Sequence, residues 1–209
     1  MLKFDEQKER RKKGRKIAGR LKTTQPKLAR AMSRCRPDNQ CQLYGCPSCE
    51  WRRGRRTGKI LYKVCRAIAL THPNAKYFYL SVALPLIEVE DLTQALELNK
   101  TAIQKLLNLK ITDLCSVQFT SFVFFSEKIS VKTSVILATS GENGFSEYDW
   151  NELWRQSSNL PLVPNVEAYP VLRSKIPAIT RHVAPCCDLS LCPDEILGDF
   201  TVQIQSIFT

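Results

Sequence analysis

The sequence lacks any uninterrupted apolar run near the roughly 20 residues that a membrane-spanning helix needs. Its opening stretch, MLKFDEQKERRKKGRK, also lacks the apolar centre of an export signal. The absence of both features argues against a membrane protein and against a secreted one. We therefore expect a cytoplasmic protein with no membrane partner, and its 209 residues suffice for one sizeable core or two small modules.

The sequence has only two histidines, His72 and His182, but nine cysteines. Without an export signal, the cysteines argue against a disulfide framework, because the cytosol keeps thiols reduced. Zinc takes four tetrahedral thiolate or imidazole ligands, and a C-x2-C turn presents two sulfurs to one ion. A C-x5-C-x4-C-x2-C pattern therefore predicts a structural zinc site, with Cys65 or His72 as alternative ligands if only part of the pattern binds. The four cysteines of the pattern are Cys35, Cys41, Cys46 and Cys49.

Acidic residues are scarce in the first third of the chain. Residues 1–66 hold 21 Lys and Arg against five acidic residues, whereas residues 67–209 hold 10 against 15. A basic segment ahead of a mildly acidic body is typical of a nucleic-acid-binding arm, and a solubilising tail is the alternative. We take two basic runs as candidate contacts: Arg10, Arg11, Lys12 and Lys13 in the first, and Arg52, Arg53, Arg55, Arg56 and Lys59 in the second.

Trp51 lies between the cysteine pattern and the second basic run. Guanidinium groups bind phosphate oxygens well, and a turn fixed by zinc would present them from a rigid base. Two roles for Trp51 follow, because its ring either packs against the zinc turn or stacks on a base. We include Trp51 among the candidate nucleic-acid contacts.

Hydrophobic periodicity divides the chain into helices and strands. Residues 3–22 predict a frayed amphipathic helix that orders, if at all, on nucleic acid. The element order predicts an α+β fold in which helices cover one face of an antiparallel sheet. Three parts are expected, namely a flexible basic arm (1–26), a zinc module with a linking helix (27–70) and an α+β domain (71–209). The predicted helices are 57–70, 92–109 and 147–156, and the predicted strands are 77–83, 116–125, 133–139 and 166–172.

Several motifs follow one another over residues 27–190. They are KLARAMSRC and CQLYGCPSCEWRR, a helix with the pair Asn99-Lys100, the strand pair TSFVFFSEKISVKTSVILA, and a W-x3-W helix. In this order they resemble the rolling-circle plasmid replication initiators, which bind a plasmid origin and nick one strand with a tyrosine. The resemblance implies an HUH-endonuclease-like fold and DNA as the partner, either single-stranded or as an origin duplex.

The sequence departs from that family where the chemistry would take place. Active members carry a His-x-His-x-His-type cluster on one strand, and the alignment puts Ser130, Lys132 and Ser134 at those positions. Cys186 stands where the nucleophilic tyrosine is expected. A phosphotyrosine link needs an aligned phenolate and a cation that offsets the phosphate charge. The resemblance therefore implies a DNA-binding protein derived from an initiator, with these catalytic positions vacated.

Three alternatives stay open. A working nickase would need another nucleophile, for which Tyr169 is nearest, or Glu127 and Lys132 acting without a metal. An RNA-binding zinc module would use the same arginine-rich run. The tail pattern H-x3-CC-x4-C could hold a second zinc, although adjacent cysteines serve one ion poorly. Its residues are His182, Cys186, Cys187 and Cys192.

Overall fold

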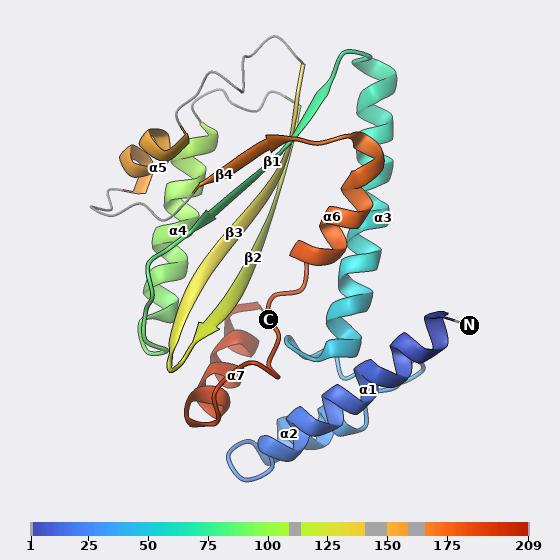
Figure 1. Ribbon diagram of the computed structural model, residues 1–209, viewed down its shortest axis with the longest axis vertical. Helices are drawn as coiled ribbons and strands as arrows, with labels where there is room; N and C mark the ends of the chain where they lie inside the picture. The colour runs from blue at the N-terminus through green and yellow to red at the C-terminus, as the bar shows by residue number, and fades with distance from the viewer. Residues whose placement is uncertain (1, 109–113, 141–149, 159–165, 209) are drawn as a thin grey trace.

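The computed structural model describes residues 2–108, 114–140, 150–158 and 166–208. Its centre is a four-stranded antiparallel sheet in the order β2-β3-β1-β4 (Figure 1). The predicted α+β class and antiparallel sheet are confirmed. The strands are β1 (Lys76–Ala83), β2 (Cys115–Phe125), β3 (Lys128–Thr139) and β4 (Glu167–Pro170).

The helices surround this sheet, and a short 3-10 turn, Arg173–Lys175, joins β4 to the helix that follows. Figure 1 shows α4 and α5 on one side of the sheet and α3 and α6 on the other. Within the described residues, no helix has the length and apolar character that crossing a bilayer requires. The helices are α1 (Leu2–Arg20), α2 (Pro26–Ser33), α3 (Pro47–Thr71), α4 (Leu92–Leu107), α5 (Trp150–Ser158), α6 (Ile176–Val183) and α7 (Asp194–Phe208).

The prediction that helices cover only one face of the sheet is wrong. On one face, Asn99 of α4 donates a hydrogen bond of 2.5 Å to Thr133 Oγ1 of β3. On the other face, Tyr77 and Tyr79 of β1 belong to a buried cluster with Leu61 of α3 and Ile176 of α6. Successive residues of a strand point to opposite faces, so a central strand that is apolar throughout buries both of its sides.

Helix α3 begins ten residues earlier than the sequence predicts. Pro47 occupies the first turn, where its fixed φ and missing N–H are favourable, and Cys46 precedes it as the N-cap residue. Gly58 lies inside α3 at its close approach to α6. A Cβ at this position would be only 3.3 Å from the Pro177 carbonyl oxygen of α6. Gly54 and Gly58 therefore permit close packing of α3 against α6.

The expected flexible arm, residues 1–26, is instead largely the helix α1, which is docked on the rest of the protein. Ile17 and Leu21 are fully buried in the main hydrophobic cluster. Lys13 Nζ lies 2.5 Å from Asp188, and Arg20 Nε lies 2.5 Å from Asp194. Part of the positive charge of α1 is thus neutralised by the C-terminal segment, which orders the helix without nucleic acid.

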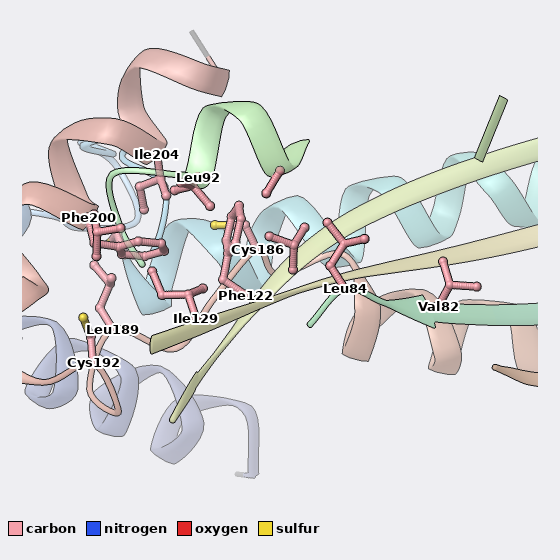
Figure 2. Close-up of a cluster of buried hydrophobic side chains, with 14 of the residues drawn as sticks. Val82, Leu84, Leu92, Phe122, Ile129, Cys186, Leu189, Cys192, Phe200 and Ile204 are labelled. Atoms are coloured by element: carbon pink, nitrogen blue, oxygen red, sulfur yellow. The ribbon is translucent and has the colours of Figure 1, made fainter. Parts of the chain in front are cut away.

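The tail after residue 172 contains two helices, α6 and α7, that the sequence analysis does not predict. Figure 2 shows Phe200 and Ile204 of α7 packed beside Phe122 of β2. The Phe122 and Phe200 rings meet edge to face, with centroids 5.4 Å apart. Helix α7 covers one end of the sheet. Cys186 and Cys192 of the tail therefore belong to the same buried cluster as α7 and the core of the sheet.

Candidate metal centre and basic surface

The four predicted zinc ligands come together at the start of α3. Cys35 follows α2, Cys41 lies in the loop, and Cys46 and Cys49 flank the first turn of α3. Their four sulfurs all lie within 4.8 Å of one another. The Sγ atom of Cys49 lies 3.6 Å from those of both Cys35 and Cys41.

This spacing fits a zinc ion. Tetrahedral Zn–S bonds of about 2.3 Å place neighbouring sulfurs about 3.8 Å apart. The 3.6 Å separations are close to that value, and three of the four residues are buried, with Cys41 half-buried. Four thiolates would fill the coordination shell of zinc and leave no position for a substrate, so the centre is suited to a structural role.

The thiols of the cluster influence one another. Hydrogen bonding to Cys46, together with Cys49 and burial, raises the pKa of the Cys41 thiol. Hydrogen bonds from Cys41 and Cys46 lower the pKa of Cys49, because they stabilise its thiolate. Without a cation the cluster therefore holds its negative charge unevenly, and a metal that binds all four sulfurs displaces the remaining protons.

The alternative ligands do not join the cluster. Cys65 lies on α3 sixteen positions beyond Cys49, about 24 Å along the helix axis. His72 caps the exposed C-terminal end of the same helix. Across the described ranges, no second group of three or more His, Cys, Asp or Glu side chains comes within ligand distance, so the tail cysteines do not form one with His182.

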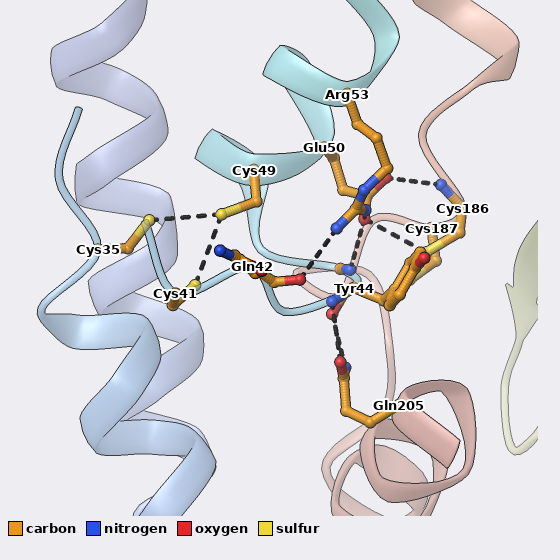
Figure 3. A network of polar contacts seen from close by, with 11 residues as sticks. Cys35, Cys41, Gln42, Tyr44, Cys49, Glu50, Arg53, Cys186, Cys187 and Gln205 are labelled. Atoms are coloured by element: carbon orange, nitrogen blue, oxygen red, sulfur yellow. Dashed lines mark hydrogen bonds and ion pairs between the residues drawn. The ribbon is translucent and has the colours of Figure 1, made fainter. Parts of the chain in front are cut away.

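Glu50 connects the cysteine loop to the C-terminal tail (Figure 3). Glu50 is buried, with only 4% of its side chain exposed. One carboxylate oxygen accepts hydrogen bonds from the Gly45 amide at 3.0 Å and from Arg53, and the other accepts one from the Cys186 amide at 3.0 Å. Burial acts to lower the pKa of Arg53, but the Glu50 carboxylate more than offsets this and raises it. A buried charge thus holds loop, helix and tail together.

A second connection joins the loop to α7. The Gln205 side chain accepts a hydrogen bond from the Tyr44 amide and donates one to the Tyr44 carbonyl, each of 3.0 Å. The Tyr44 ring stacks on Phe208 with centroids 4.7 Å apart, and the Arg53 guanidinium lies 3.9 Å from the same ring. Two separate parts of the C-terminal segment therefore contact the loop and its helix, namely the tail at Cys186 and helix α7 at Gln205.

Gly45 occupies the tightest point of this loop. Its φ is +76°, and a Cβ would lie 2.6 Å from two carbons of Leu189. We expect Gly45→Ala to destabilise the protein by about 2–4 kcal/mol, from the strained φ and the overpacking together. Gly19→Ala is the matched control, since a Cβ there meets nothing within 4 Å, and it should stabilise α1 by about 0.5–1 kcal/mol. Thermal unfolding of both variants checks the pair, and equal midpoints would contradict the packing described for Gly45.

The predicted basic contacts divide into three groups. Arg53 and Lys13 have acidic partners on other segments, Glu50 and Asp188, and Arg10 pairs with Glu6 of its own helix at 3.3 Å. Arg52 donates hydrogen bonds to the backbone carbonyl oxygens of Arg36 and Pro37, and these acceptors are uncharged. The others lie on α1 and the first half of α3, half-buried or exposed: Arg11, Lys12, Arg55, Arg56 and Lys59.

Trp51 is held between arginines. The guanidinium carbon of Arg10 lies 4.7 Å from the indole ring, and that of Arg55 lies 4.8 Å from it. These cation–π contacts tie α1 to α3 beside the cysteine cluster. The indole anchors two guanidinium groups, a role that neither sequence-level interpretation of Trp51 includes.

The three positions that the family resemblance assigns to a histidine cluster share one face of β3. Ser130, Lys132 and Ser134 alternate along the strand, on the side that faces α3 and α6. Ser134 Oγ lies 2.9 Å from the Tyr79 hydroxyl, and Lys132 Nζ lies 3.9 Å from a carboxylate oxygen of Glu167. The side chains at these three positions are hydroxyl and ammonium groups. This face therefore offers no imidazole ligand to a divalent cation.

The alternative catalytic residues are dispersed. Tyr169 of β4 pairs with Tyr79, and their rings are 5.0 Å apart. Burial, with Tyr79 and Glu167 nearby, raises the pKa of the Tyr169 phenol. Glu127 lies in the exposed turn between β2 and β3 and not within either strand. Cys186 is buried against Glu50, and its carbonyl oxygen accepts a hydrogen bond of 2.7 Å from the Phe122 amide of β2.

No family model, curated protein or solved structure matches this chain. The resemblance to replication initiators consequently depends on the motifs themselves. Two elements of the site are not found by motif analysis, namely the carboxylate of Glu50 and the clamp of Gln205. The only sequence signal for Glu50 is an acidic residue in the first turn of a helix, where it is favoured by the helix dipole.

Proposed function

We propose that this chain is a zinc-containing nucleic-acid-binding protein, derived from a rolling-circle replication initiator, which binds DNA without cleaving it. The observation that carries the proposal is the basic surface formed by α1 and the first half of α3, next to four clustered thiols. Exposed Lys12 and Arg15 of α1 and exposed Arg56 and Lys59 of α3 belong to this surface.

The charge of this surface favours a polyanion. Helix α1 holds nine Lys and Arg against three acidic residues. Within the described ranges no carboxylate pairs with Lys12, Arg15, Arg56 or Lys59. Unpaired cations on fixed helices attract phosphate groups and release counterions when they bind, which gives affinity for nucleic acid of many sequences.

The thiol cluster gives this surface a fixed base. Cys35 and Cys41 belong to the segment between α2 and α3, while Cys46 and Cys49 belong to the start of α3. A zinc ion shared by all four would hold that segment against the helix that presents the arginines. Zinc in this role supports binding, not chemistry, because its four ligands leave no open position.

Strand β3 supports the part of the proposal that the chain derives from a nicking enzyme but does not itself nick DNA. Alternate positions Ser130, Lys132 and Ser134 share a face, as a histidine cluster would, but they supply no imidazole. The one cation among them, Lys132, lies beside Glu167. Tyr169, the nearest candidate nucleophile, has a raised pKa, which is the opposite of what an attacking phenolate needs.

The proposal is tested by fluorescence anisotropy with labelled single-stranded DNA, duplex DNA and RNA of one sequence. We expect the zinc-loaded protein to bind DNA, with log K falling linearly with log salt by about 0.7–0.9 per phosphate contact. No binding to any of the three at low salt would contradict the proposal. Preferential binding of the RNA would replace DNA by RNA as the partner, because only 2′-hydroxyl contacts distinguish the two.

A further inference from the structure

A hollow of about 730 Å³ lies beside the cysteine cluster, two of whose residues, Cys41 and Cys49, line it. Its wall is formed by the loop 40–44, by one side of α3 and by the end of α7. Three arginines line it, Arg52, Arg53 and Arg56, and no acidic side chain of the described residues does. The hollow is therefore a concave site that combines three guanidinium groups with two thiols of the cysteine cluster.

The three arginines have different tasks. Arg53 is fully engaged, since it bonds Glu50, donates to the Gln42 carbonyl at 3.1 Å and covers the Tyr44 ring. Arg52 donates only to uncharged backbone carbonyls, and no described carboxylate pairs with Arg56. Arg53 thus forms the wall, while Arg52 and Arg56 keep guanidinium charge for a ligand.

The wall is rigid where the ligand would lie. Gln42 has a left-handed φ of 58°, an uncommon conformation for a residue with a side chain, and its carbonyl holds Arg53. Cys41 and Cys49 of the thiol cluster line the same hollow, and Gln205 and Phe208 close it from α7. Little ordering would be required on binding, because the surrounding groups already hold one another.

We propose that this hollow binds a single nucleotide unit of the nucleic-acid strand, with its phosphate between Arg52 and Arg56. The inference rests on the proposed function and adds to it one built contact site. Guanidinium forks match phosphate oxygens, and the volume exceeds what a phosphate alone needs, so the sugar and base enter as well. The amide of Gln40 and the edge of Phe208 offer the polar and apolar surface for that remainder.

The test compares two double variants that each remove two positive charges. R52Q/R56Q changes the hollow, and K12Q/R15Q changes the exposed side of α1. Affinity for a labelled single-stranded DNA is measured at one salt concentration, with circular dichroism and zinc content confirming that both variants fold. We expect R52Q/R56Q to bind at least about tenfold more weakly than K12Q/R15Q, because a built phosphate site loses charged hydrogen bonds while the outer helix loses only screened attraction.

Competition supplies a second readout on the unmodified protein. Thymidine monophosphate should displace the labelled strand, whereas thymidine should not, because the proposed contact is made mainly to the phosphate group. If the unmodified protein binds no nucleic acid, the proposed function fails. If it binds, but the two double variants lose affinity equally and the monophosphate does not compete, the hollow is not a nucleotide site and the proposed function stands.

Discussion

Replacing Cys49 by serine is expected to cost the protein its metal and much of its stability. Cys49 has two cluster neighbours, Cys35 and Cys41, each 3.6 Å from its sulfur. Metal binding and local folding share one free energy, which in small zinc modules amounts to about 10–16 kcal/mol. The remaining core of this protein retains part of the fold, so we expect a loss of several kcal/mol, on the order of 10 °C or more in Tm.

The measurement is zinc content by native mass spectrometry together with thermal unfolding. Cys115→Ser is the control, because Cys115 begins β2 and does not belong to the cluster. We expect zinc bound to the unmodified protein and to the control, and none bound to Cys49→Ser. A Cys49→Ser protein that keeps both its zinc and its affinity for DNA would show that the cluster is not the metal centre.

Replacing Glu50 by glutamine is expected to destabilise the protein by about 3 kcal/mol or more. The change leaves the Arg53 charge without its buried partner, and removing one member of a buried ion pair is costly. The backbone amides of Gly45 and Cys186 each donate to one oxygen of the Glu50 carboxylate. In glutamine an NH2 group replaces one of these oxygens, so one of the two amides loses its acceptor. The loss corresponds to a Tm decrease of about 6–12 °C for a chain of this length.

Glu88→Gln is the matched control for this change. Glu88 pairs with Lys128 at 3.1 Å, but both side chains are about half exposed, so the expected loss is below about 1 kcal/mol. Hydrogen exchange gives a second measurement, because Glu50→Gln should increase exchange selectively in the segment around Cys186 and in α7. Equal unfolding midpoints for the two variants would mean that Glu50 does not hold the tail to the cysteine loop.

The parts of the fold that depend on local pattern could be predicted from the sequence. The apolar, aromatic run of β1 and the apolar stripe of α4 are encoded within each segment, and both elements lie close to their predicted positions. Residues 109 and 147–149 of the predicted helices lie outside the described residues. The cysteine cluster was also predictable, because its four ligands are close in sequence and geometry restricts how they meet.

The parts that depend on distant partners could not be predicted. Helix α1 is too charged to indicate burial, and it becomes ordered because Lys13 and Arg20 meet Asp188 and Asp194, about 175 residues away. The contact of Glu50 with Cys186 spans 136 positions. Local periodicity carries no information on which distant surface a helix meets, so the second helical layer of the sheet was missed as well.

The basic residues illustrate the same limit. Arg53 and Arg56 look equivalent in the sequence, since both belong to the segment Arg52-Arg53-Gly54-Arg55-Arg56. In the structure Arg53 is bonded to Glu50 inside the protein, while Arg56 is exposed at the hollow. A charge run alone therefore overstates how many of its members are available to a partner.

The central claim is that the protein binds DNA and does not cleave it. The most direct test incubates the zinc-loaded protein with end-labelled single-stranded and duplex DNA in Mg²⁺ or Mn²⁺, and scores the gel shift and any covalent protein–DNA adduct. We predict a shift of the intact DNA with no adduct and no shorter product. A covalent adduct or a cleaved strand would contradict the account, since Tyr169 or another residue would then be a working nucleophile.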